Sequence, residues 1–286
     1  MVIAGTRGGN PVELTGVGRR YGLRGPWILR DVGLRVPRGA LLRIEGANGS
    51  GKSTLLRLLA GIDAPSAGRI TGRPRTAYVP ERFPAALPLT AVDYLTRLGR
   101  VHGLRRPDAA RAALEWLERF GAAGHARTPL SRLSKGTSQK VAVAQGLVGR
   151  PELLVLDEAW TGLDRASREV LDRAVLDRVA DGASVVFVDH DPRRLAGDCH
   201  AVHRVAAGRL LSAVTAEPRV RIEAEGPATL PERLPGDPVR EPLGGVVRLT
   251  VAAADSDALL RALLTARPSW HIRSVTAADV PEEPRR

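Results

Sequence analysis

The hydrophobic positions of this chain switch repeatedly between the two-residue spacing of strands and the 3.6-residue spacing of helices. Short apolar or alternating runs predict strands at 12–14, 27–36, 41–45, 69–71, 76–79, 153–156 and 184–189. Helical spacing predicts helices at 53–62, 90–102, 107–120, 138–148 and 166–180. Because strands and helices alternate, we expect an α/β fold with a mostly parallel sheet covered on both faces. We also expect antiparallel strands near the N-terminus.

The pattern changes after about residue 216. Strands are predicted there at 219–226, 246–252 and 271–276, with a Pro- and Gly-rich connection at 227–245, a helix capped by Asp255 and a mobile tail at 280–286. We therefore divide the chain into a domain at 1–216, with a helical subdomain at about 82–148, and a small α+β domain at 217–286.

Composition narrows the class of protein. The 286 residues are 43% hydrophobic but only 3% aromatic, and the single cysteine, Cys199, excludes an internal disulfide, which is typical of a reducing compartment. The first ten residues, MVIAGTRGGN, contain no apolar stretch of signal-peptide length, and no run approaches 18 apolar residues, so we expect no membrane span. The net charge of +12 comes almost wholly from arginines spread over every segment, so we expect no specific nucleic-acid partner.

Residues 46–54 read GANGSGKST and fit the phosphate-binding pattern G-x-x-x-x-G-K-[ST]. Glycines let the backbone approach a phosphate closely, and the following helix attracts the anion to its N-terminus. Lys52 can reach the β- and γ-phosphates of ATP, and the Ser53 hydroxyl can bind Mg²⁺. A flexible Gly/Ser turn is the alternative, but the strand before and the helix after favour a nucleotide site. The expected contacts are Asn48, Gly49, Ser50, Gly51, Lys52, Ser53 and Thr54.

Two carboxylates, Asp157 and Glu158, follow the apolar run at 153–156. Asp157 suits the role of directing Mg²⁺ beside a phosphate loop. The neighbouring Glu158 can point elsewhere and accept a proton from attacking water. Taken alone, this segment would be interpreted as a polar strand end that leads into a turn. Together with the phosphate-binding pattern at 46–54, it favours an ATPase.

Four further features resemble the ATP-binding subunits of ABC transporters. They are a signature-like segment at 133–140 (LSKGTSQK), a D-loop-like segment at 159–164 (AWTGLD), the segment 185–191 (VVFVDHD) with a switch-like His190, and Tyr21, which lies 25 residues before Gly46, where the family has an adenine-stacking aromatic. The resemblance covers roughly residues 11–212.

The resemblance implies a role for each feature. In the family the signature contacts the γ-phosphate held by a second subunit, which assigns Ser134 and Gly136 to a partner's ATP and implies a dimer. His190 is implied to hydrogen-bond the γ-phosphate or the attacking water, and Asp164 to lie at the dimer seam. Ser134 and Asp164 can also be helix caps, and His190 can be a structural histidine. For Tyr21, stacking on adenine and packing within the protein both remain open.

Three positions depart from the commonest family pattern. Glu81 stands where the family has a Gln that touches Mg²⁺ and senses the membrane partner; a carboxylate can bind the metal but cannot donate as an amide does. Lys135 and Thr137 replace Gly and Gln of the signature, and this form resembles the drug and antibiotic exporter group.

These features together predict an ATPase that uses ATP and Mg²⁺, dimerises as a homodimer or with a related chain, and powers a separate permease at the inner face of the cell membrane. The predicted direction is export. The alternatives are a soluble ABC ATPase that acts on ribosomes or DNA, and a poorly hydrolysing, nucleotide-gated regulatory module. The sequence does not encode the cargo, because this subunit never has to touch it.

Overall fold

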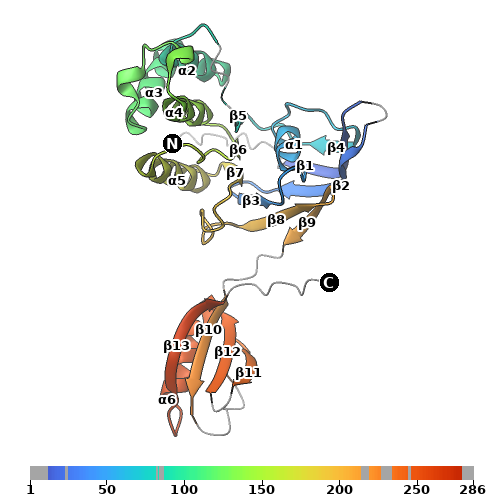
Figure 1. Cartoon of the computed structure of the whole chain (residues 1–286), viewed down its shortest axis with the longest axis vertical. Helices are drawn as coiled ribbons and strands as arrows, with labels where there is room; N and C mark the ends of the chain where they lie inside the picture. Colours follow the sequence, from blue (N-terminus) through green and yellow to red (C-terminus); the bar gives the residue numbers. More distant parts are fainter. Residues whose placement is uncertain are drawn as a thin grey trace, which may run out of the picture. The chain divides into compact units, whose positions relative to one another are not determined.

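The computed structural model describes residues 12–22, 25–81, 83, 87–213, 219–226, 234–243 and 246–278. The chain forms two compact units, residues 1–213 and 214–286 (Figure 1). The boundary predicted from the sequence is at residue 216. Each unit has its own sheets and its own hydrophobic core.

The first unit contains a six-stranded sheet in the order β5-β6-β7-β3-β8-β9, in which only β9 runs antiparallel to its neighbour. A separate antiparallel sheet has the order β2-β1-β4. The strands are β1 (Val12–Arg20), β2 (Trp27–Val36), β3 (Leu41–Glu45), β4 (Ala67–Thr71), β5 (Thr76–Val79), β6 (Leu153–Asp157), β7 (Ser184–Val188), β8 (Ala201–Ala206) and β9 (Arg209–Ala213). The predicted fold class is confirmed.

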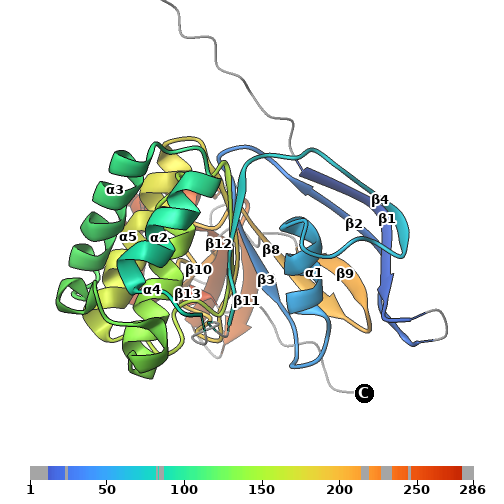
Figure 2. The same ribbon diagram turned by 90° about the horizontal axis from the view of Figure 1, so that it is seen from above.

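Helices cover both faces of the large sheet. They are α1 (Lys52–Leu59), α2 (Ala91–Val101), α3 (Arg106–Arg119), α4 (Lys135–Leu147) and α5 (Arg165–Ala180), with short 3₁₀ turns η1 (Ala123–His125) and η2 (Leu130–Arg132). Figure 2 shows α1 between the large sheet and the antiparallel strands, and α2 to α5 gathered on the other side. Along β6, Leu154 and Leu156 enter the core under α2 to α5, whereas Leu153 and Val155 enter the core under α1. This strand is buried on both sides, which explains its continuous apolar run.

Several element boundaries differ from the prediction. β1 continues to Arg20, beyond the predicted 12–14. The prediction stops early because irregularities in the pairing of β1 interrupt the regular alternation of its side chains. α1 ends at Leu59, and α4 begins at Lys135, directly after the cap residue Ser134. The helix predicted from residue 90 begins at Ala91, and Thr90 caps it: the Thr90 hydroxyl accepts a hydrogen bond from the backbone N–H of Asp93 at 3.2 Å.

The second unit is an antiparallel sheet in the order β11-β12-β10-β13 with one helix packed on it. Its elements are β10 (Arg219–Glu225), β11 (Val239–Leu243), β12 (Val246–Ala252), α6 (Ala253–Thr265) and β13 (His271–Ala278). Two expectations were wrong. The predicted connection at 227–245 contains the edge strand β11, and α6 begins before Asp255, which lies in its first turn, where a negative charge favours the helix N-terminus. The predicted mobile tail at 280–286 lies outside the described residues.

None of the helices in the described ranges combines the length and the hydropathy required to cross a membrane.

Candidate active site

The phosphate loop, residues 46–54, joins the end of β3 to α1. Gly46 and Gly51 have φ angles of 148° and 108°, a region that L side chains rarely adopt. A Cβ at Gly46 would also collide with the carbonyl oxygen of Val205. The loop therefore depends on these glycines to turn before the helix begins.

Two side chains of the loop carry polar atoms that suit a phosphate. The ammonium of Lys52, a residue only 8% exposed, donates to the carbonyl oxygens of Gly46 and Ala47 at 2.8 and 3.1 Å. The hydroxyl oxygen of Ser50 is buried without a hydrogen-bond partner in the described part of the chain, and such an unpaired group costs about 1–3 kcal/mol. A phosphate oxygen would give Ser50 an acceptor and Lys52 an anion. The loop residues therefore fit a nucleotide phosphate.

Ser53, on α1, meets Asp157 at the carboxyl end of β6. The Ser53 hydroxyl donates to Asp157 Oδ1 at 3.2 Å, and the Tyr78 hydroxyl, from β5, donates to Oδ2 at 2.9 Å. Burial raises the pKa of Asp157; the two hydrogen bonds oppose this effect, while the carboxylates of Glu158 and Glu81 add to it. A divalent cation among these oxygens would offset both burial and repulsion, so the group fits Mg²⁺.

Glu158 pairs with His190, which follows the neighbouring parallel strand β7. His190 Nε2 lies 2.8 Å from Glu158 Oε1. The backbone of Glu158 is left-handed, with φ 53°, and its N–H donates to the carbonyl of Val188 at 3.1 Å. This conformation costs a non-glycine residue about 1–2 kcal/mol, and strain of this kind concentrates at functional sites. In this pair the Glu158 carboxylate can accept a proton, and the His190 imidazole can hold that carboxylate in place.

Lys52, Ser53, Glu158 and His190 line one cavity of about 460 Å³, whereas Ser50 and Asp157 do not line it. It is lined by Ile28, Asn48, Gly49, Gly51, Lys52, Ser53, Thr54, Glu81, Glu158 and His190. All of these residues except Ile28 are predicted from the sequence as site residues. The structure therefore brings the phosphate loop, Glu81 and the Glu158–His190 pair to one place, at the carboxyl ends of β3, β5, β6 and β7.

Tyr21 is not part of this lining. Its side chain is half exposed, and its hydroxyl donates to Asp63 Oδ2 at 3.2 Å. The guanidinium carbon of Arg19 lies 4.7 Å from the centre of the ring. The packing alternative for Tyr21 is therefore present in the structure, and adenine stacking stays a prediction.

Ser134 and Asp164 each cap a helix. The Ser134 hydroxyl accepts from the backbone N–H of Thr137 at 3.2 Å, and Asp164 Oδ1 accepts from that of Ser167 at 2.8 Å. Lys140 Nζ lies 2.7 Å from Asp164 Oδ2, and this hydrogen bond, followed by those from Ser167, lowers the pKa of Asp164 to about 2. The capping alternative is therefore present for both residues.

Sequence reasoning missed two residues that hold the site together. Tyr78 anchors Asp157, as described above. Arg43, in β3 and 3% exposed, donates four hydrogen bonds of 3.0–3.2 Å to backbone carbonyls at 189, 191, 192 and 194, in the turn that carries His190. The available signal was a polar side chain at a position that the strand pattern buries, since such a group needs partners.

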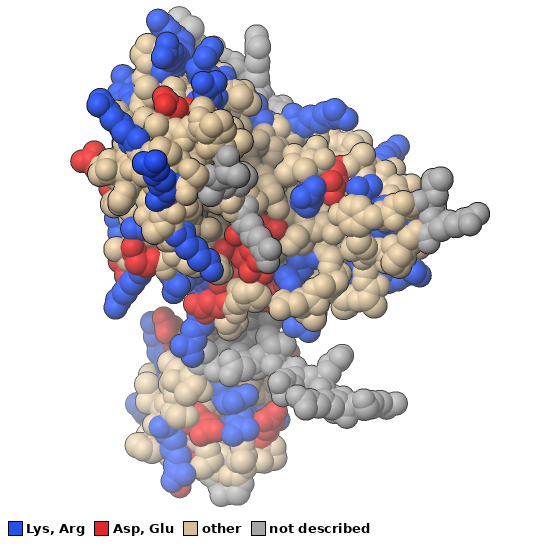
Figure 3. Space-filling view, turned by 45° about the horizontal axis from the view of Figure 1, so that its top comes forward, with Lys and Arg blue, Asp and Glu red and all other residues tan. Residues whose placement is uncertain are grey.

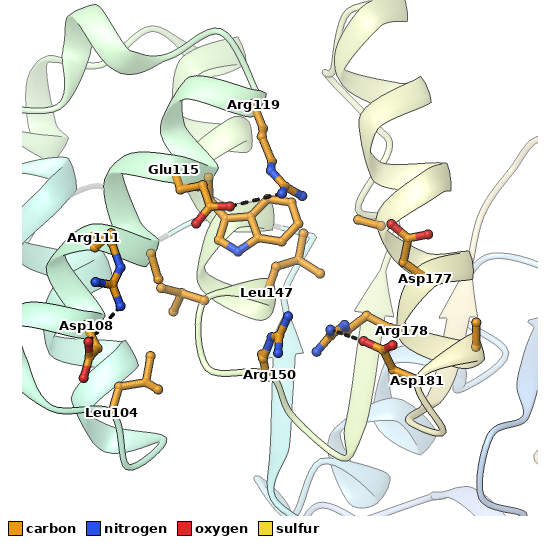
Figure 4. Close-up of a pocket in the computed structure, with 15 residues that line it drawn as sticks. Leu104, Asp108, Arg111, Glu115, Arg119, Leu147, Arg150, Asp177, Arg178 and Asp181 are labelled. Atoms are coloured by element: carbon orange, nitrogen blue, oxygen red, sulfur yellow. Dashed lines mark hydrogen bonds and ion pairs between the residues drawn. The ribbon is translucent and has the colours of Figure 1, made fainter.

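A second cavity, of about 510 Å³, lies between α3 and α5 (Figure 4). Its lining residues lie between positions 104 and 181 and include none of the phosphate loop. Three of its arginines are ion-paired with carboxylates three or four positions away: Arg111 with Asp108, Arg119 with Glu115, and Arg178 with Asp181. These cations already have local counter-charges, so we assign the nucleotide chemistry to the cavity at the phosphate loop.

Comparison with known proteins decides the family. Residues 29–161 match the family described as ABC transporter. The aliphatic sulfonates import ATP-binding protein SsuB of Mycobacterium avium is 35% identical over 243 residues, which cover 82% of this chain and 89% of that protein. The chain belongs to the ABC transporter family. The zinc import ATP-binding protein ZnuC of Cereibacter sphaeroides is 43% identical over 169 residues, or 57% of this chain and 67% of that protein.

Solved structures agree on the fold. A chain described as the ATP-binding subunit of an ABC transporter matches with a TM-score of 0.65 and 24% identity, over 71% of this chain and 90% of that one. The cassette MJ0796, in a dimeric structure bound to ADP and Pi, matches with a TM-score of 0.63 and 23% identity, over 71% of this chain and 98% of that one. At these identities the likeness shows the fold alone.

As an ATP-binding subunit of the ABC family, this protein is an ATPase that uses ATP and Mg²⁺. The predicted activity and cofactors are confirmed. These comparisons support the ABC transporter family but not the predicted exporter group, because both relatives named above are import ATP-binding proteins.

Proposed function

We propose that this ATPase works as a dimer that encloses two ATP molecules and drives a separate membrane permease. The observation that carries the proposal is the place of the signature residues: among the described residues, Ser134, Gly136 and Asp164 do not line the phosphate-loop cavity of their own chain. A second chain would bring its α4 N-terminus, with its N–H groups and positive dipole end, to the γ-phosphate. The second chain is another copy or a related ATP-binding chain.

In this proposal the chemistry is divided among Lys52, Ser53, Asp157, Glu158 and His190. Lys52 binds the β- and γ-phosphates and offsets the charge that develops there during hydrolysis. Ser53 and Asp157 hold Mg²⁺, which supplies positive charge to the phosphate oxygens when bound. Glu158 orients the attacking water and accepts its proton, while His190 holds the carboxylate in place. Closure of the dimer moves the permease, and hydrolysis reopens it.

Ser134→Arg should abolish ATP-induced dimerisation and leave nucleotide binding to the single chain intact, because the bulky cation blocks the start of α4 and not the phosphate loop. We would measure mass by light scattering with and without ATP in the Glu158→Gln background, and nucleotide affinity separately. Ser269→Arg, at an exposed serine of the second unit, is the matched control. An ATP-bound Ser134→Arg chain that still dimerises would refute the sandwich arrangement.

The direction of transport is proposed to be export. The form of the signature, with Lys135 and Thr137, supports export by resemblance, whereas the import names of the two relatives point the other way. Reconstitution with the cognate permease in vesicles, with ATP outside, decides the direction: an exporter accumulates cargo in the lumen, and an importer releases it. Binding to that permease would place the protein at the inner face of the cell membrane.

Glu81→Gln should change permease-stimulated ATP hydrolysis by about threefold or more, the effect of one exposed charge, and should change basal hydrolysis less. Glu81 lines the cavity, and its carboxylate adds to the raised pKa of Asp157. Its charge attracts the metal and repels the nucleotide, so the net effect on ATP affinity should be small. An amide restores two donors for sensing the partner. The ATPase rate with and without permease is the measurement; an equal change in both would place Glu81 in the chemistry.

Two alternative functions remain distinguishable by experiment. On the face shown in Figure 3, Lys and Arg side chains are scattered among acidic and neutral residues, whereas a nucleic-acid site would gather them in a patch or stripe. ATPase activity stimulated by ribosomes or DNA would favour a soluble ABC protein. Wild-type turnover no faster than that of Glu158→Gln would favour a regulatory module.

A further inference from the structure

A chain of hydrogen bonds links the metal-directing carboxylate to the helix that begins at the signature segment. Tyr78, on β5, takes part twice. Its hydroxyl donates to Asp157 Oδ2 at 2.9 Å, and its carbonyl oxygen accepts from Gln145 Nε2, on α4, at 3.2 Å. The hydroxyl of Tyr94, in the first turn of α2, donates to Gln145 Oε1. These bonds join the sheet to two helices of the helical subdomain.

Gln145 is a buried amide on a helix whose other buried residues nearby are apolar, and it is only 8% exposed. Directly after it, Gly146 lies so close to β5 that an added Cβ would be 2.6 Å from the side chain of Val79. The Tyr94 ring packs edge-on against Phe83, with centroids 5.4 Å apart. A buried amide that loses a partner keeps its desolvation cost, so these bonds favour one position of α4 over others.

Because Gln145 lies far from the signature end of α4, a small rotation of the helix at this contact would displace that end by several ångströms. Gln145 lies 11 positions after Ser134, which is about 16 Å along a helix. A rotation of α4 by about 10° around Gln145 would therefore move the signature end by about 3 Å. Misplacement by about 1 Å can already cost an active site 10²-fold in rate.

We propose that Tyr78 is a positioning residue that fixes the signature end of α4 relative to the Mg²⁺-directing carboxylate, with Gln145 and Tyr94 completing the link. The hydroxyl of Tyr78 holds Asp157 so that Oδ1 faces Ser53, and its carbonyl oxygen holds α4. The effect on α4 rests on the proposed dimer, since the signature acts on ATP bound by a second chain.

Three single-hydroxyl deletions test this proposal. Tyr78→Phe removes the bond to Asp157, and Tyr94→Phe removes the bond to Gln145. The control, Ser184→Ala, removes a buried hydroxyl that donates to the carbonyl of Pro37 at 2.7 Å, at the opposite end of the sheet. We expect all three variants to fold, with similar small losses of thermal stability.

Mn²⁺ in place of Mg²⁺ gives a spectroscopic readout of the metal site, with a non-hydrolysable ATP analogue bound. Tyr78→Phe should weaken Mn²⁺ binding about tenfold, the usual effect of losing an outer partner of a metal ligand. Tyr94→Phe should leave Mn²⁺ binding unchanged and lower kcat about tenfold, with KM for ATP within about twofold of wild type.

Either variant behaving like Ser184→Ala in its own readout would overturn the proposal. The Mn²⁺ measurement reads a metal site whose residues all come from one chain, so it can be made whether or not the chains dimerise. A wild-type chain that stays monomeric with ATP would therefore refute the dimer and leave the metal-site test of Tyr78 valid.

Discussion

The Glu158→Gln variant should bind ATP as the wild type does and turn it over about 10²- to 10⁴-fold more slowly, the contribution expected of a general base. Glutamine keeps the shape of glutamate and can still accept a hydrogen bond from His190, whose Nε2 lies 2.8 Å from Glu158 Oε1. An amide cannot take a proton from water, so the substitution removes the chemical step and little else. If the protein dimerises as proposed, the variant should accumulate as an ATP-bound dimer.

The matched control is Glu152→Gln, directly before the other end of β6, where the carboxylate accepts a hydrogen bond from the backbone N–H of Arg75 at 2.9 Å. This variant should retain normal turnover. Steady-state rates test the loss of turnover, equilibrium nucleotide binding tests the unchanged ATP affinity, and light scattering tests the accumulation of the dimer. Near-normal hydrolysis by Glu158→Gln would mean that another group accepts the proton.

The parts of the site that could be predicted are short motifs, whose residues are consecutive in the sequence. The phosphate loop works through its own backbone, so residues 46–54 carry its chemistry without help from elsewhere. Asp157 ends an apolar strand and Glu158 follows it, and His190 follows another apolar strand. Because parallel strands end at the same edge of a sheet, the pattern alone places these side chains together.

Contacts between distant residues could not be predicted in this way. The bond from Tyr78 to Asp157 joins positions 79 residues apart, and Arg43 reaches a turn 146–151 residues away. The strand patterns mark Arg43 as buried and Tyr78 as half-buried, but they do not identify the partners of these side chains. β11 escaped for a different reason: it is an edge strand whose five residues are all exposed, and it contains Pro242, so it has neither apolar alternation nor strand-like composition.

Lys52→Ala should lower kcat by about 10²- to 10³-fold, because the ammonium stabilises charge that develops on the transferred phosphate. ATP affinity should fall by about 10- to 10²-fold, the value of a hydrogen bond to a charged group. The fold should persist, since the bonds from Lys52 to Gly46 and Ala47 lie within the phosphate loop. The backbone of that loop is set by its glycines, which the substitution leaves in place.

Lys52→Arg separates charge from geometry at the same position. It keeps the positive charge, but a planar guanidinium does not fit a site that is only 8% exposed and shaped around a compact ammonium, so turnover should stay well below wild type. Thermal unfolding without nucleotide is the decisive companion measurement. A drop of many degrees in Lys52→Ala would make the lysine a structural residue, because a group that acts only on the nucleotide stabilises the chain only when the nucleotide is bound.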